Sequence, residues 1–146
     1  MDKASEAFEI LAAQRMNCAQ AVLSVFCQDF GLDRTQALCL AQAFGGGMGR
    51  SGSICGAVTG AYMVLGLSQK ISADKPRASL ERTYEMVREF QRKFEVIHGS
   101  VMCRQLIDFD LNNPESLAAA RAKKVFTNVC PRFVADAVCI VEGLLV

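Results

Sequence analysis

The sequence contains seven cysteines, and their positions divide them into two groups. The first group, called here the helix-start cysteines, stands where the pattern predicts the cap or first turn of a helix: Cys18, Cys55, Cys103 and Cys130. A helix N-terminus presents free N–H groups and a partial positive charge, which favour a thiolate over a thiol. A cysteine there can have a pKa below its usual ~8.5, and the thiolate is both a redox nucleophile and a metal ligand. The sequence therefore predicts one shared thiol site.

The other three cysteines, Cys27, Cys39 and Cys139, fall inside predicted helices between apolar neighbours. Free cysteine is among the most buried residue types, so we expect these three to pack in the core. Cys27 follows Cys18 by nine residues, and Cys139 follows Cys130 by nine. On a continuous helix, nine steps of ~100° place two side chains on opposite faces. The spacing therefore favours a cluster of four thiols over a cluster of seven.

Two kinds of chemistry suit the helix-start cysteines. In thiol–disulfide exchange, a low-pKa thiolate, for which Cys55 is the first choice, attacks a disulfide or oxidant, and Cys18 resolves the mixed disulfide. The alternative is a metal site in which all four thiolates bind Zn²⁺ or an iron–sulfur cluster. Against it, structural zinc sites normally use closely spaced ligand pairs, and this chain has no C-x-x-C. A third hypothesis is a non-catalytic helical binding module whose cysteines serve only as packing residues.

A glycine-dense segment, 45–52, precedes Cys55 and matches G-x-G-x-x-G. No strand is predicted before it and no lysine follows, so neither a dinucleotide fingerprint nor a Walker A loop is indicated. We expect a loop that packs tightly and directs N–H groups toward Cys55. The lesser alternative is an anion or small cofactor bound at this helix start. Its candidate contacts are Gly47, Gly49, Arg50 and Gly56.

Three arginines and the single histidine lie near these cysteines in the sequence. Arg50, Arg104 and Arg132 can add positive potential to the thiol site. His98 stands at a predicted helix end, where a solvated cation is the first expectation and a site member the second.

The elements that must position these residues are helical almost throughout, since Ala, Leu, Met, Gln, Glu and Arg dominate and no alternating β-branched run occurs. We expect an all-α single domain over residues 1–146, a bundle of about five to seven helices with a glycine-rich loop before a central apolar helix. The predicted helices cover about 2–14, 17–31, 33–44, 53–67 and 76–97, a short one at Cys103, one from Asn113 and a last one from Cys130.

Composition excludes several functions. The 16 basic and 15 acidic residues give a net charge of +1, whereas a nucleic-acid binder needs a clear basic excess. The longest apolar run, 54–67, is shorter than the ~20 residues of a membrane span. The odd cysteine count and an opening without an apolar leader favour the cytoplasm. We expect a redox partner protein or a small thiol or disulfide as the partner, and the sequence leaves a homodimer open.

Several motifs together resemble the C_GCAxxG_C_C family of redox-active proteins. They are Asn17-Cys18-Ala19-Gln20-Ala21-Val22, Phe44-Gly45-Gly46-Gly47-Met48-Gly49, Cys55-Gly56-Ala57-Val58-Thr59-Gly60, Cys103-Arg104 and Cys130-Pro131. The resemblance covers essentially the whole chain, and its four cysteines correspond to the helix-start cysteines. It implies a redox role in a bacterial or archaeal cytoplasmic protein whose gene often lies near transporter genes.

Overall fold

The computed structural model describes all 146 residues, which form helices and no strand. In chain order the elements are α1 (Lys3–Ala12), α2 (Cys18–Ser24), the 3₁₀ helix η1 (Cys27–Phe30), α3 (Arg34–Ala41), the 3₁₀ helix η2 (Gln42–Phe44), α4 (Gly45–Met48), α5 (Gly56–Leu67), α6 (Pro76–His98), α7 (Cys103–Ile107), α8 (Pro114–Ala122), α9 (Val125–Asn128) and α10 (Cys130–Leu145). The predicted all-α class is confirmed.

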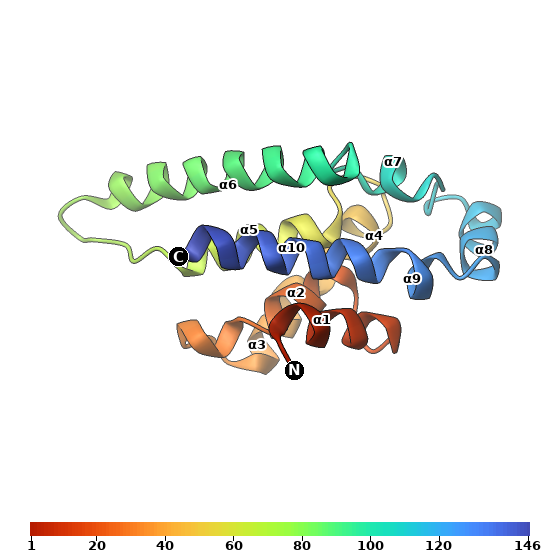
Figure 1. The fold of residues 1–146 in the computed structure, drawn as a ribbon, viewed down its shortest axis with the longest axis horizontal. Helices are drawn as coiled ribbons and strands as arrows, with labels where there is room; N and C mark the ends of the chain where they lie inside the picture. The colour runs from red at the N-terminus through yellow and green to blue at the C-terminus, as the bar shows by residue number, and fades with distance from the viewer.

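The helices lie in three layers (Figure 1). The two apolar helices α5 and α10 form the middle layer, α1, α2 and α3 cover one side, and the long helix α6 covers the other. The buried residues form one continuous hydrophobic core. In α6 only Met86, Phe90 and Phe94 are buried, and the other residues of this helix, most of them polar, are exposed or half-buried. None of the helices combines the length and the apolar character that crossing a membrane requires.

The predicted second helix, 17–31, is divided in the structure. The segment α2 ends at Ser24, and a turn at Val25 and Phe26 leads into η1. Gly31 closes the segment with a φ of 75°, the left-handed conformation that glycine adopts without strain. Cys27 therefore does not share a continuous helix with Cys18, and the argument from their spacing does not apply to this pair.

Candidate functional site

Backbone pairing brings the starts of α5 and α7 together. The N–H of Cys55 donates to the carbonyl of Val101 at 2.8 Å, and the N–H of Cys103 donates to the carbonyl of Ser53 at 2.7 Å. Around them, Ile54 and Met102 form an isolated antiparallel bridge. Two cysteines that are distant in sequence therefore begin neighbouring helices.

A close crossing of α2 and α5 brings Cys18 beside this pair. A Cβ atom on Gly56 would lie 2.9 Å from the Cβ of Cys18 and from the backbone nitrogen of Ala19. A Cβ on Gly60 would lie 2.8 Å from the carbonyl oxygen of Ala19. Both distances are shorter than real Cβ contacts, so only glycine permits this approach. The two glycines of the Cys-Gly-Ala-x-x-Gly motif thus set the distance between two cysteine-bearing helices.

Two amide side chains fix the start of α2. The side chain of Asn17 accepts from the N–H of Gln20, and the Gln20 side chain accepts from the N–H of Asn17, which completes a capping box. The same side chains reach outward, since Asn17 Nδ2 donates to the carbonyl of Gln42 and Gln20 Nε2 donates to that of Leu38, each at 3.0 Å. Cys18, the first residue of α2, is therefore held against α3 and η2.

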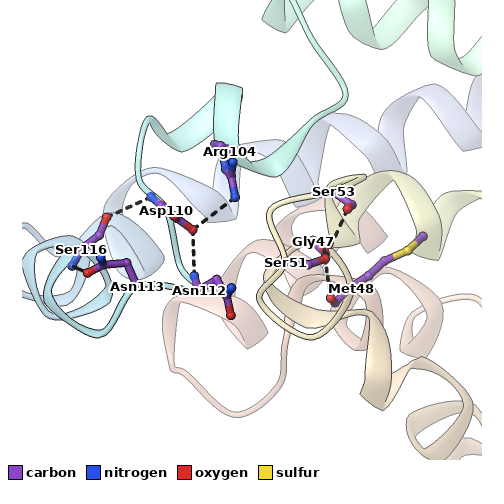
Figure 2. Close-up of polar contacts among 9 residues, drawn as sticks. All are labelled: Gly47, Met48, Ser51, Ser53, Arg104, Asp110, Asn112, Asn113 and Ser116. Carbon is purple, nitrogen blue, oxygen red and sulfur yellow. Dashed lines mark hydrogen bonds and ion pairs between the residues drawn. The ribbon is translucent and has the colours of Figure 1, made fainter.

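The glycine-dense segment forms a left-handed turn. The five consecutive residues from Gly46 to Arg50 all have positive φ, between 64° and 68°. Such a turn strains any residue that has a Cβ, which explains why three of the five are glycine. A Cβ on Gly47 would lie 2.7 Å from the Cβ of Cys103. Figure 2 shows the Ser51 hydroxyl closing the turn, 2.8 Å from the carbonyl oxygens of Gly47 and Met48.

One cavity of about 440 Å³ gathers the predicted site residues. The helix-start cysteines all line it, and so do Gly47, Gly49, Arg50 and Gly56. Each of the four cysteines also stands at a helix start, because Cys55 caps α5 and the others are the first residues of α2, α7 and α10. The structure thus brings these eight residues to one cavity, and their roles in catalysis or binding stay predictions.

Burial, and not the helix N-terminus, governs two of these thiols. It raises the pKa of Cys55 to about 12, although hydrogen bonds from the backbone N–H groups of Ala57 and Val58 oppose the rise. It also raises the pKa of Cys103 to about 11. The expectation that Cys55 is a low-pKa thiolate is therefore wrong. The N–H groups that reach its sulfur come from α5 itself, not from the glycine-dense segment.

Cys18 and Cys130 form a coupled pair. The interaction between their two thiols is the largest cause of the pKa shift of each. It raises the pKa of Cys18, and burial adds to the rise. It lowers the pKa of Cys130 against the opposing effect of burial. Cys130 is therefore the cavity thiol that most readily becomes a thiolate.

The other three cysteines lie outside the cavity, but only Cys27 is buried as expected. Cys39 and Cys139 are exposed, so the expectation that they pack in the core is wrong. On α3 the buried residues are Ala37 and Ala41, and Cys39 points from the opposite face. On α10 Cys139 has a buried residue on each side in the sequence, yet its own side chain lies on the exposed face of the helix.

Two of the three expected arginines have acidic partners. Arg104 lies 3.2 Å from Asp110, an ion pair visible in Figure 2. Arg132 is exposed and lies 3.8 Å from Asp136. Only Arg50 of this group lines the cavity.

His98 is not a solvated helix end, which corrects the first expectation for it. Its side chain is only 9% exposed, and its ring packs on Phe94 and Phe133 with centroids 4.6 and 4.9 Å away. Its Nε2 lies 2.9 Å from a carboxylate oxygen of Asp136 without the alignment of a hydrogen bond. The ring does not line the cavity, but Phe133 does.

The cavity has further residues that sequence reasoning did not find. Arg121, in the last turn of α8, lines it, and so do Phe126 and Phe133. Nothing in the local sequence distinguishes Arg121 from the other exposed arginines. The two phenylalanines look like ordinary core positions in the helical pattern.

The arrangement of the four cavity thiols bears on the metal-site alternative. No group of three or more His, Cys, Asp or Glu side chains has an arrangement that could hold a metal ion. The four sulfurs thus share a cavity without being placed as a ligand set.

A comparison with protein families identifies one that matches most of the chain. A family model described as "Putative redox-active protein (C_GCAxxG_C_C)" matches residues 16–144. Comparisons with curated proteins and with solved structures gave no match. The matched segment includes all four helix-start cysteines and the Cys-Gly-Ala-x-x-Gly motif. The chain therefore belongs to the C_GCAxxG_C_C family of redox-active proteins.

Proposed function

We propose that this protein is a thiol–disulfide oxidoreductase in which Cys130 is the nucleophile and Cys18 the resolving thiol. The observation that carries the proposal is the interaction between these two thiols, which line the same cavity. It lowers the pKa of Cys130, as a nucleophile requires, and it places a protonated second thiol in contact with it. Cys55 is not the nucleophile in this proposal, because its pKa of about 12 keeps its thiol protonated near neutral pH.

The reaction has two steps. The Cys130 thiolate attacks one sulfur of a substrate disulfide, so that a mixed disulfide forms and the other half leaves as a thiolate, which takes up a proton. Cys18 then loses its proton and attacks the Cys130 sulfur, which releases the second half as a thiol. The substrate disulfide is reduced to two thiols, and the two cysteines are oxidised to one disulfide. The reverse sequence oxidises a dithiol substrate.

Cys55 and Cys103 supply a second pair of thiols in the same cavity. Their raised pKa values make them poor first nucleophiles. We propose that they reduce the Cys18–Cys130 disulfide in a slower later stage, by the same two exchange steps, and become oxidised themselves. The fully reduced protein could then donate two electron pairs, one from each pair of thiols.

The metal-binding alternative has weaker support. The convergence of four sulfurs on one cavity favours it, but no three donors are arranged as ligands. A site that works as free thiols requires a reducing compartment, and we therefore also propose that the protein acts in the cytoplasm.

The test is a count of thiols before and after mild oxidation, combined with disulfide mapping by mass spectrometry. The exposed cysteines would react first and obscure the result, so the starting protein carries Cys39→Ser and Cys139→Ser. Brief treatment with a small disulfide should remove two thiols, link Cys18 to Cys130, and be reversed by dithiothreitol. Loss of no cavity thiol, or a first disulfide that excludes Cys130, would contradict the proposal. Stoichiometric zinc or iron in protein purified without oxygen would favour the metal site instead.

A further inference from the structure

The charges that line the cavity are all positive. Its only charged side chains are those of Arg50 and Arg121, and no Asp, Glu, Lys or His lines it. Neither arginine belongs to any of the ion pairs of the structure. The nearby Arg104, by contrast, is neutralised by Asp110, as Figure 2 shows. The cavity therefore keeps two guanidinium groups whose hydrogen-bonding capacity is unused.

These two arginines come from different parts of the chain. Arg50 ends the run of positive φ values in the glycine-dense segment, and Arg121 lies in the last turn of α8. Both are exposed, whereas Cys55, Cys103 and Cys130 are buried. The positive groups thus stand at the solvent side of the cavity and the sulfurs at its inner side.

The remaining wall limits what can reach Cys130. Leu106, Ile107, Phe126 and Phe133 give the cavity an apolar side, and its volume of about 440 Å³ is in the range of small-molecule pockets. Cys130 is only 5% exposed. A disulfide fixed in a folded protein surface cannot approach a sulfur at that depth, whereas a small flexible disulfide can enter the cavity.

We propose that the substrate is a low-molecular-weight disulfide that carries anionic groups, which Arg50 and Arg121 bind while its sulfurs reach Cys130. The proposal rests on the thiol–disulfide function proposed above. Guanidinium groups bind carboxylates and phosphates through paired hydrogen bonds, so the shared chemistry of the ligand is a disulfide with carboxylate or phosphate groups. The apolar wall accommodates the carbon chain between the sulfur and the anion.

A series of three small disulfides that differ in charge tests this proposal. Dithiodipropionate is a dianion, hydroxyethyl disulfide is neutral and cystamine is a dication, and the three are similar in size. The full-length protein with Cys39→Ser and Cys139→Ser is mixed with each, and formation of the Cys18–Cys130 disulfide is followed by mass spectrometry. Each rate is divided by the rate of the same disulfide with free mercaptoethanol, which removes differences in intrinsic reactivity.

We expect the normalised rate of the dianion to exceed that of the neutral disulfide by roughly tenfold, and the dication to be slowest. Near 1 M salt this preference should shrink, because exposed charges are screened. Arg50→Gln and Arg121→Gln should each lower the ratio of dianion to neutral rates several-fold. Arg88→Gln, which removes one exposed positive charge on α6 away from the cavity, should keep the ratio. Inhibition by succinate or by inorganic phosphate then shows which anion the arginines prefer.

Two negative results have different meanings. If all three disulfides oxidise Cys18 and Cys130 at equal normalised rates, the inference about charge is wrong and the proposed function stands. If none of them oxidises this pair, the proposed function itself is wrong. A preference that survives in both arginine variants would also overturn the assignment of Arg50 and Arg121.

Discussion

The thiols of Cys18 and Cys130 interact inside the cavity, and the two cysteines are the first residues of α2 and α10. The interaction raises the pKa of Cys18 and lowers that of Cys130, so Cys130 loses its proton first. A helix start alone does not have this effect. Cys55 receives two backbone N–H groups at the start of α5, and burial still raises its pKa to about 12. The contact between two thiols therefore distinguishes Cys130 from its neighbours.

Removal of the thiol at position 18 should make Cys130 less reactive. Cys18→Ala takes away the interaction while the burial of Cys130 stays, so its pKa should rise. Alkylation of Cys130 by iodoacetamide at pH 8 should slow several-fold, measured by peptide mass spectrometry. Cys18→Ser keeps a hydroxyl donor and should recover part of the rate. Equal rates in wild type and Cys18→Ala would show that Cys18 does not control Cys130.

Burial predicts the order in which the cysteines outside the cavity react. Cys39 and Cys139 are exposed and should be labelled by a maleimide within minutes in the native protein. Cys27 is fully buried, and its thiol hydrogen-bonds to the carbonyl of Ser24, so it should react only on unfolding. Site-by-site labelling with and without urea measures this. Early labelling of Cys27 in the native protein would contradict the packing of η1.

Glycine positions along α5 should differ sharply in their tolerance of a methyl group. Gly60→Ala places a Cβ 2.8 Å from the carbonyl oxygen of Ala19 and should lower the free energy of unfolding by about 1–3 kcal/mol. Gly66→Ala, on the same helix, meets nothing within 4 Å and should raise it by about 0.5–1 kcal/mol. Urea unfolding under reducing conditions measures both. Similar values for the two variants would show that α2 and α5 do not cross closely.

The glycine-dense segment allows a second comparison of this kind. Gly47 and Gly49 both have positive φ, but only Gly47 faces close neighbours, the Cβ of Cys103 at 2.7 Å and the backbone nitrogen and oxygen of Ser53 at 2.8 Å. Gly49→Ala should therefore cost only the backbone strain of about 1–2 kcal/mol. Gly47→Ala should lower the unfolding free energy further and also change the alkylation rate of Cys103. If the two variants are equally stable, the contact with Cys103 is not what requires glycine at position 47.

Sequence patterns were sufficient to predict the all-α class and to identify the four cysteines that line the cavity. The signals were local: a cap at Asn17, a glycine break before Cys55 and a proline after Cys130 each mark a helix start. Helix starts are also where the chain turns toward its neighbours, so cysteines placed there can converge. The break between α2 and η1 was not visible, because Val25 and Phe26 are compatible with a continuing helix.

Properties that depend on the three-dimensional surroundings could not be read from the sequence. Whether Cys139 faces the core depends on the rotation of α10, not on its apolar neighbours. The pKa of Cys55 depends on how deeply the other helices bury it, which outweighs the helix start that the sequence does show. Arg121 lines the cavity from the last turn of α8, and no local motif in the sequence indicates that this helix contributes to the site.

The buried thiols should make the protein less stable in alkaline solution. The pKa of Cys55 is raised from its ordinary value of 9.0 to about 12, and that of Cys103 to about 11. Between pH 9 and 11 the unfolded chain has lost these protons while the native protein retains them. The free energy of unfolding should therefore fall as the pH rises, by about 1.4 kcal/mol per pH unit for each retained proton. Below pH 9 both states are protonated, and the two thiols contribute no slope.

Urea unfolding between pH 8 and 11, with a reductant present, measures this dependence. Cys55→Ala should flatten the slope above pH 9 by about 1.4 kcal/mol per pH unit, whatever its effect on stability at neutral pH. A wild-type slope in Cys55→Ala would mean that its thiol titrates alike in the native and unfolded states. Burial would then not control the cavity thiols, and the selection of Cys130 as nucleophile would need another cause.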